Sequence, residues 1–282
     1  MKLIIGGVRG TSTVAQASFL KYGGETTSLL IEGRDGARII LDAGTGIQPL
    51  GDRLAADPAD RRVLLLMTHY HLDHVVGLPS LGLIYDPAWH IRIAAPAHGE
   101  FDVGATMSRL MDKPFWPLQV SDLLARIQFD SLTCCPSPSV LRWGGFEVRC
   151  CPLHHPGGCT AYRIDEPATG ASLVVATDVE WGESSPEERA ALRSLCTTPR
   201  PASLLLMDAQ YEPEEYEAHR GWGHSTWKEA LEFADAVGAA QVRMIHHDPR
   251  KNDDALDRVN AKVVALNPAA ALARAGEEFD LG

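Results

Sequence analysis

The sequence predicts an α+β fold in a single domain. Apolar runs of strand length recur in both halves of the chain, and glycine, proline or small polar residues bound them. Helical patterns lie between and after these runs. The 282 residues are 45% hydrophobic and 22% charged, an ordinary globular composition that permits a sizeable core. We therefore expect one domain over 1–282 with two strand-rich halves, and an inserted helical and loop segment at about 99–122.

The first half is predicted to consist mainly of strands. They are expected at 3–8, 28–32, 38–42, 63–67, 91–95 and 124–129. The turn residues Arg34-Asp35-Gly36 predict that the second and third strands form a hairpin. A short helix is expected to begin at His74. The helical part of the insertion is interrupted at 113–118, where two prolines flank two aromatic residues and cannot continue a helix. This interruption could be a pocket lid, a dimer contact or core packing.

The second half alternates strands with helices. The strands are expected at 140–143, 146–151, 160–164, 172–176, 203–207 and 242–245. Gly144-Gly145 supply a hairpin turn between the first two. The helices are expected at 187–195, from Thr226 to the stop at Gly238, and at 253–266. Thr226 and Glu229 form a capping-box pattern, and the apolar residues after them recur at three- and four-residue steps.

The charge balance limits the kind of partner. Lys and Arg number 26 against 37 Asp and Glu, for a formal net charge of −11. Affinity for polyphosphate comes mainly from clustered basic residues, so small substrates are favoured over a broad nucleic-acid surface. Residues 1–10 lack an apolar core long enough for a signal peptide, and no run approaches transmembrane length. We therefore expect a cytoplasmic protein that does not enter a membrane.

The cysteines offer two interpretations. They are Cys134, Cys135, Cys150, Cys151, Cys159 and Cys196, with two adjacent pairs and no C-x-x-C spacing. A chain of this length does not need disulfides, so reduced thiols are expected. Zinc binding by the first four of these cysteines is the alternative.

The strongest chemical signal follows the apolar run 63–67. The segment from Thr68 to His74 carries three imidazoles and a carboxylate within six positions, at His69, His71, Asp73 and His74. Such a set makes a poor hydrophobic core, but imidazole nitrogens and carboxylate oxygens are the ligands that zinc and similar cations prefer. A tight turn after a rigid strand can aim these groups in different directions. The segment therefore predicts a metal site.

Other strands also end in residues that can do chemistry. Asp42 ends the strand expected at 38–42, either as a turn or cap residue or as a group that orients a metal ligand. Asp178 and Asp208 follow two later strands. Two pairs of histidines are adjacent in the sequence, His154-His155 and His246-His247. Only one histidine of each pair is expected to face the metal site, because successive side chains of an extended backbone point in opposite directions. The residues alone do not decide which one. His224 lies beside a helix N-terminus, which attracts anions.

These motifs together resemble the metallo-β-lactamase fold superfamily. Within it, the chain resembles the phosphodiesterase branch, which includes tRNA 3′-processing endonucleases of the tRNase Z type and cyclic-phosphate phosphodiesterases. The resemblance is carried by His69-x-His71-x-Asp73-His74, His155, Asp178 and His246, and by the segments 42–46, 155–158, 208–211 and 223–226. It implies a four-layer αββα sandwich.

The resemblance also implies a set of ligands. One metal would be bound by His69, His71 and His155, and a second by Asp73, His74 and His246, with Asp178 bridging. Two divalent ions of this kind, with zinc expected and manganese or iron as alternatives, can share a hydroxide that attacks phosphorus. The family pattern favours His155 and His246 within their pairs.

The remaining polar residues are assigned around this centre. Asp73 is counted with the catalytic residues, and His224, held by Asp208, is expected to act as the general acid for the leaving group. Asp42 and His154 are expected beside the ligands. His247 is expected to be structural. The other histidines, expected to be surface or structural residues, are His90, His98 and His219.

The predicted function is a metal-dependent hydrolase, namely a phosphodiesterase for a small or cyclic phosphodiester. The chain lacks the glycine-rich basic arm that grips tRNA in the tRNA-processing enzymes, and together with the net charge of −11 this argues against tRNA as a substrate. Hydrolysis of an ester, lactone or thioester by the same centre is one alternative, and a ligand sensor without turnover is another. A homodimer is a possible assembly.

Overall fold

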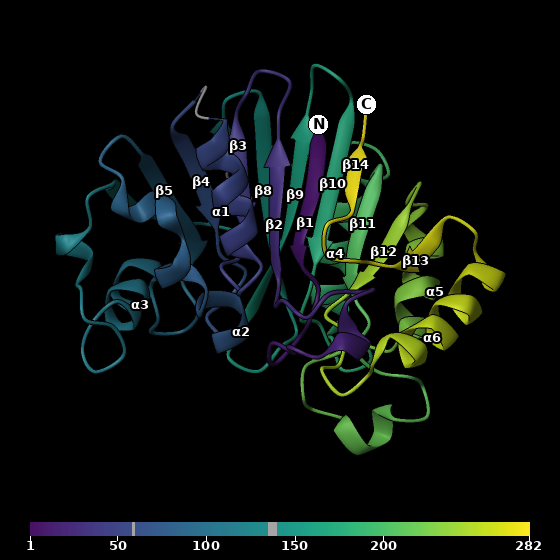
Figure 1. Ribbon diagram of the computed structural model, residues 1–282. Coiled ribbons are helices and arrows are strands. Elements are labelled where there is room, and N and C mark those ends of the chain that lie inside the picture. Colours follow the sequence, from purple (N-terminus) through teal and green to yellow (C-terminus); the bar gives the residue numbers. More distant parts are fainter. Residues whose placement is uncertain (58–59, 135–139) are drawn as a thin grey trace.

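Two seven-stranded sheets pack face to face in the computed structural model, which describes residues 1–57, 60–134 and 140–282 (Figure 1). The first sheet has the order β14-β1-β2-β3-β4-β5-β6, and the second β13-β12-β11-β10-β9-β8-β7. The strands of the first sheet are β1 (Lys2–Gly7), β2 (Ser28–Glu32), β3 (Arg38–Leu41), β4 (Arg62–Leu66), β5 (His90–Pro96), β6 (Arg126–Leu132) and β14 (Glu278–Asp280). The strands of the second are β7 (Leu141–Trp143), β8 (Phe146–Leu153), β9 (Cys159–Glu166), β10 (Ala171–Ala176), β11 (Leu204–Asp208), β12 (Val242–Ile245) and β13 (Ala270–Leu272).

Helices cover both outer faces of the sandwich. Apolar side chains of α1 (Ile47–Ala56), α2 (Leu72–Val75) and α3 (Val103–Leu110) pack in one cluster on the first sheet. Those of α4 (Pro186–Thr197), α5 (Trp227–Val237) and α6 (Asp253–Leu266) pack in another cluster on the second sheet. A third cluster fills the space between the sheets. The predicted four-layer αββα sandwich is therefore confirmed. None of the described helices is both long enough and apolar enough to cross a bilayer.

Strands that are buried on both faces explain the continuous apolar runs in the sequence. In β4, Leu64 and Leu66 face the space between the sheets, whereas Val63 and Leu65 face the outer helices. This alternation follows from the two-residue period of a strand. Because each face of such a strand meets a core, the sequence shows a solid apolar run and no alternation with polar residues.

The core between the sheets allows a direct test of stability. Leu206 in β11 is fully buried there. We expect Leu206→Ala to lower the free energy of unfolding by about 2–5 kcal/mol, because the lost methyl groups leave a cavity. Urea unfolding measures this change. Leu266→Ala is the matched control, since that leucine is 67% exposed on α6. Equal effects of the two substitutions would contradict the placement of Leu206.

One α-helix and two strands were not predicted. Helix α1 contains Pro49 and Gly51, which usually mark turns. A proline in the first turn is tolerated, because backbone N–H groups there have no hydrogen-bond partner within the helix. Strand β13 is alanine-rich and adopts an extended conformation because it pairs in parallel with β12. Strand β14 is a three-residue edge strand paired with β1. In each case packing by distant residues outweighs local preference.

The insertion at 99–122 is only partly helical. Besides α3 it holds a short 3-10 turn at Val120–Asp122. Within the interrupted part, Trp116 packs against the outer cluster of the first sheet, and Phe115 is 69% exposed. Core packing therefore accounts for at least one of the two aromatic residues.

The prediction of reduced cysteines is wrong at two positions. Cys134 and Cys150 form a disulfide, with Cα atoms 5.1 Å apart. The bond links the segment after β6 in the first sheet to β8 in the second, so packing of the two sheets brings distant cysteines within reach. It also excludes the four-cysteine zinc site, of which Cys135 lies outside the described residues. Cys151, Cys159 and Cys196 are buried thiols.

Candidate metal centre

The predicted ligands gather at one end of the sandwich. Strands β3 and β4 are parallel, as are β10, β11 and β12, so their carboxyl ends meet at the same edge. This is the lower end in Figure 1, where α2 lies. The candidate residues come from the segments that follow these strands and β8, and they are His69, His71, Asp73, His74, His155, Asp178 and His246.

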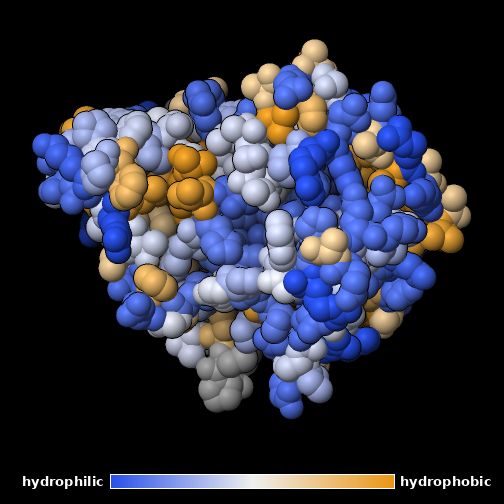
Figure 2. All heavy atoms as spheres, turned by 90° about the horizontal axis from the view of Figure 1, so that it is seen from below, coloured by the Kyte–Doolittle hydropathy of each residue, from blue (hydrophilic) through white to orange (hydrophobic). Residues whose placement is uncertain are grey.

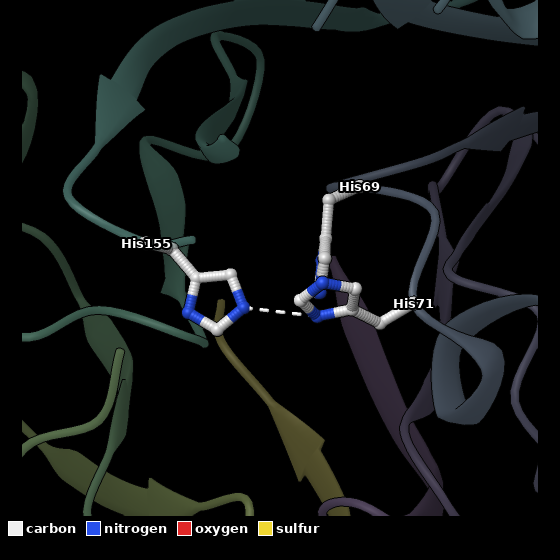
Figure 3. A group of neighbouring side chains, drawn as sticks. All are labelled: His69, His71 and His155. Atoms are coloured by element: carbon white, nitrogen blue, oxygen red, sulfur yellow. Dashed lines mark hydrogen bonds between the residues drawn. The ribbon is translucent and has the colours of Figure 1, made fainter. Parts of the chain in front are cut away.

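Three histidines form the first group. Figure 3 shows the imidazoles of His69, His71 and His155 converging from two separate loops. The Nε2 atom of His155 lies 3.0 Å from Nδ1 of His71. The ring centroids of His69 and His155 are 4.9 Å apart. One nitrogen from each ring is therefore available to a single cation.

Two carboxylates and two histidines form the second group. They are Asp73, His74, Asp178 and His246, all buried. Nε2 of His246 lies 3.1 Å from a carboxylate oxygen of Asp73 and 3.1 Å from one of Asp178. Nε2 of His74 lies 3.2 Å from the other oxygen of Asp178.

Asp178 lies between the two groups. Its Oδ1 atom is 3.7 Å from Nε2 of His69 and 3.9 Å from Nε2 of His155, as well as close to His246. Its Oδ2 atom faces His74. The carboxylate can thus contact a cation in either group, as the sequence resemblance implied for a bridging ligand.

Hydrogen bonds on the far side of each ring orient the ligands. Nδ1 of His155 donates to the carbonyl of Gly223 (2.9 Å), and Nδ1 of His246 donates to the amide oxygen of Gln210 (2.7 Å). Because an oxygen of this type only accepts, the proton resides on Nδ1, and the lone pair of Nε2 faces the cluster. The sequence indicated no such role for Gln210 or Gly223.

Asp42 orients a further ligand. One of its carboxylate oxygens accepts from Nδ1 of His74 (2.7 Å) and from Oγ1 of Thr68 (2.8 Å). The other accepts from the backbone N–H of Thr68 (2.7 Å). Thr68 Oγ1 in turn lies 3.0 Å from Nδ1 of His69. Asp42 therefore directly follows β3 and also orients candidate ligands from both groups.

The backbone takes a left-handed conformation at three residues of the site. The φ angles are 61° at Asp42, 53° at Asp178 and 66° at His246. Such angles are rare outside glycine, although Asp and His adopt them more readily than most residues. They turn the chain sharply at the end of a strand, which points each side chain into the cluster.

Electrostatics separates the neutral from the charged groups. Burial lowers the pKa of His155 to about 4, and burial together with neighbouring imidazoles lowers the pKa of His69 well below its usual value. These rings stay neutral, as a metal ligand must. Burial also opposes a charge on His74, but Asp178 and Asp73 outweigh it and raise the pKa of that imidazole, so a cation bound there would take the place of its proton.

A second histidine and aspartate pair lies beside the cluster. Nδ1 of His224 donates to Oδ2 of Asp208 (2.7 Å), whose Oδ1 accepts from the backbone N–H of Ser225 (3.0 Å). The His224 ring lies 4.6 Å from that of His246 and 5.3 Å from that of His155, centroid to centroid. Burial disfavours its charged form, but Asp208 outweighs this and raises the pKa of His224 to about 9.

The donor set fits a bound cation. Nε2 of His69 is buried and makes no hydrogen bond to any described residue, which is costly for a polar atom unless something else contacts it. The ligand atoms of each group lie within 4.8 Å of one another. Imidazole and carboxylate at this spacing are suited to divalent transition metals. The cluster can therefore bind metal.

Three further histidines lie outside the two groups, and each has a different environment. The side chain of His154 is 41% exposed, and its Nδ1 lies 3.4 Å from a carboxylate oxygen of Glu188 in α4. This contact is with the helix, whereas His154 was expected beside the ligands. His247 is buried and hydrogen-bonds the carbonyl of Ala273 (2.9 Å), which confirms a structural role. His98 had no recognisable context in the sequence, yet its Nε2 lies 3.0 Å from the carbonyl of Thr68, next to a ligand.

The chain is similar to known proteins over most of its length. A family model described as a beta-lactamase superfamily domain matches residues 37–247. A ribonuclease BN from Cronobacter sakazakii is 26% identical over 275 residues, which cover 83% of this chain and 86% of that protein. The expectation that argued against tRNA therefore finds no support, since a relative over most of the chain is named a ribonuclease.

Solved structures show the same fold. Human tRNase Z, short form, superimposes with a TM-score of 0.68 at 17% identity and covers 100% of both chains. A diphosphatase of the PhnP family gives a TM-score of 0.70 at 15% identity, over 100% of this chain and 98% of that one. At identities this low, the superpositions show a shared fold and nothing more. The match to the family model extends from the strand before Asp42 to the segment with His246.

Proposed function

The chain belongs to the beta-lactamase superfamily, and we propose that it is a metal-dependent phosphodiesterase that cleaves a small or cyclic phosphodiester. The proposal includes two divalent cations, zinc by preference with manganese or iron as alternatives. One would be held by His69, His71 and His155, and the other by Asp73, His74 and His246, with Asp178 contacting both.

The observation that carries the proposal is the pair of His224 and Asp208 beside a full set of ligands. Hydrolysis at phosphorus expels an alkoxide, which needs a proton as the bond to phosphorus breaks. His224 stands against two ligand rings and is hydrogen-bonded to a buried carboxylate. That carboxylate orients the ring and favours the imidazolium form, which is the form that can donate a proton.

The remaining chemistry divides between cation and protein. Divalent cations supply Lewis acidity and a nucleophile derived from water at neutral pH. The protein holds the ligand rings through Asp42, Gln210 and Gly223, so that the nitrogens need not reorganise during the reaction. His224 then protonates the leaving oxygen, and Asp208 keeps the ring in place.

An RNA phosphodiester is the second candidate substrate. It is favoured by the relative named ribonuclease BN, which this chain matches over 86% of that protein's length. The net charge of −11 favours the small substrate instead, because an RNA-binding surface needs clustered basic residues. Both candidates require the same bond cleavage.

A turnover screen tests the proposal. Zinc-, manganese- or iron-loaded protein should hydrolyse bis(p-nitrophenyl) phosphate and at least one of a panel of cyclic nucleotides, and metal analysis on the same preparation should find about two equivalents. A single-stranded RNA substrate distinguishes the second candidate. Removal of metal with a chelator should abolish turnover, and re-addition should restore it. Metal-loaded protein that hydrolyses lactones and thioesters but no phosphodiester would overturn the proposal.

A further inference from the structure

A cavity of about 370 Å³ adjoins the metal ligands. His69 and His71 form one end of it, and the loop at Gly157-Gly158 lies beside them. The rest of the lining comes from the segment before α3 and from α3 itself. Figure 2 shows this end of the molecule hollowed near its centre, with an apolar patch beside the hollow on the side where α3 lies in Figure 1. The volume is within the range of small-molecule sites.

Aromatic side chains form the wall nearest the ligands. Tyr70 and His98 meet edge to face with ring centroids 5.6 Å apart, and both line the cavity. His98 is held by the carbonyl of Thr68, so this wall is fixed to the segment that carries the ligands. Phe101 also lines the cavity and is 52% exposed, a large apolar surface that the fold does not cover.

A cation lies among these lining residues. Arg109, on α3, lines the cavity and is exposed, and it forms no ion pair with a described residue. Arginine is the side chain best suited to bind phosphate or carboxylate through two parallel hydrogen bonds. Glu100 also lines the cavity and can accept hydrogen bonds from hydroxyl or amino groups. The cavity thus combines aromatic faces, an acceptor and an unpaired guanidinium in a space that opens on the metal ligands.

We propose that this cavity binds one arm of the substrate, a nucleoside-like group whose aromatic ring packs on Phe101 and Tyr70 and whose second anionic group pairs with Arg109. The inference rests on the proposed function, since the reacting phosphate would sit at the metal ligands. Stacking on aromatic side chains tolerates any base, and a charge-assisted pair adds selectivity for a molecule with a second phosphate or carboxylate. Arg109 and Phe101 are therefore specificity-determining residues.

A binding experiment tests the proposal without relying on turnover. The probes are thymidine 5′-monophosphate and thymidine 3′,5′-bisphosphate, which differ by one phosphate, and isothermal titration calorimetry on zinc-loaded protein measures both dissociation constants. The unaltered protein should bind the bisphosphate about 10- to 100-fold more tightly, the range expected for hydrogen bonds to a charged group. Arg109→Ala should reduce this preference to about twofold or less, and Arg109→Lys should retain part of it.

Two further variants complete the design. Phe101→Ala should weaken the binding of both probes by about tenfold, because each loses the same stacking surface. Arg142→Ala is the control, since that exposed arginine lies on β7 and not among the cavity residues. An equal preference for the bisphosphate in the unaltered protein and in Arg109→Ala would overturn the inference. Absent hydrolysis of bis(p-nitrophenyl) phosphate with an intact preference would instead count against the proposed function alone.

Discussion

Asp178→Asn is expected to cost the protein its metal and nearly all of its activity. The carboxylate contacts ligand nitrogens of both groups, at distances from 3.1 to 3.9 Å, and it is almost completely buried. An amide keeps the shape but removes the negative charge that a divalent cation needs. Even partners that only orient ligands are worth about 10- to 100-fold in affinity, so we expect at least a hundredfold loss of metal affinity here.

Metal content and turnover should be measured on the same preparation of Asp178→Asn. Circular dichroism and thermal unfolding show whether the variant is folded. Asp112→Asn serves as the control, because Asp112 is a partly exposed residue of the insertion whose side chain contacts Lys113 and Gln119 and no residue of the cluster. A folded variant that binds as much metal as the unaltered protein, with the same affinity, would contradict the assignment of Asp178 as a shared ligand.

His224→Ala is expected to lower kcat by about a hundred- to ten-thousand-fold on a substrate with an alkoxide leaving group. The reason is that the leaving oxygen would lose its proton donor while the ligands stay in place. The same substitution should change kcat only a few-fold on bis(p-nitrophenyl) phosphate, because p-nitrophenolate leaves readily without a proton. The dependence on the leaving group separates proton donation from a general disturbance of the site.

The control for His224→Ala is His154→Ala, which removes a partly exposed imidazole that follows β8 and pairs with Glu188 of α4. Metal content should be unchanged in both variants. A uniform loss of turnover on all substrates, whatever their leaving group, would count against His224 as the general acid. No loss on any substrate would favour hydrolysis of a carbon ester, in which the leaving group is protonated differently.

The centre of the site could be predicted from sequence because its residues follow buried strands. Each apolar run ends where a polar side chain begins, and parallel strands bring such ends to a common edge, so His69, Asp178 and His246 converge. Within the adjacent pair at 246–247 the resemblance favoured His246, and in the structure the ring of His246 faces the cluster whereas the ring of His247 packs inside the protein. The strand ends were visible in the short-range pattern, whereas the choice within the histidine pair needed the family resemblance.

The surrounding residues could not be predicted in this way. Gln210 contacts a histidine 36 positions away, and Gly223 contacts one 68 positions away. His98 contacts the backbone carbonyl of Thr68, the residue before His69. Every residue type has such a carbonyl, so the sequence does not indicate this contact. The disulfide between Cys134 and Cys150 likewise depends on how the two sheets pack. Contacts of this type exist only once the whole chain has folded.

The left-handed backbone at Asp42, Asp178 and His246 implies an evolutionary conflict at the site. Glycine adopts this conformation freely, whereas another residue costs about 1 kcal/mol at each position. The side chains of these three residues are also polar and buried, which costs further free energy of folding. Selection for catalysis therefore retains residues that selection for stability would replace. In a lineage released from the reaction, these positions should drift first, and their loss would leave a more robust scaffold.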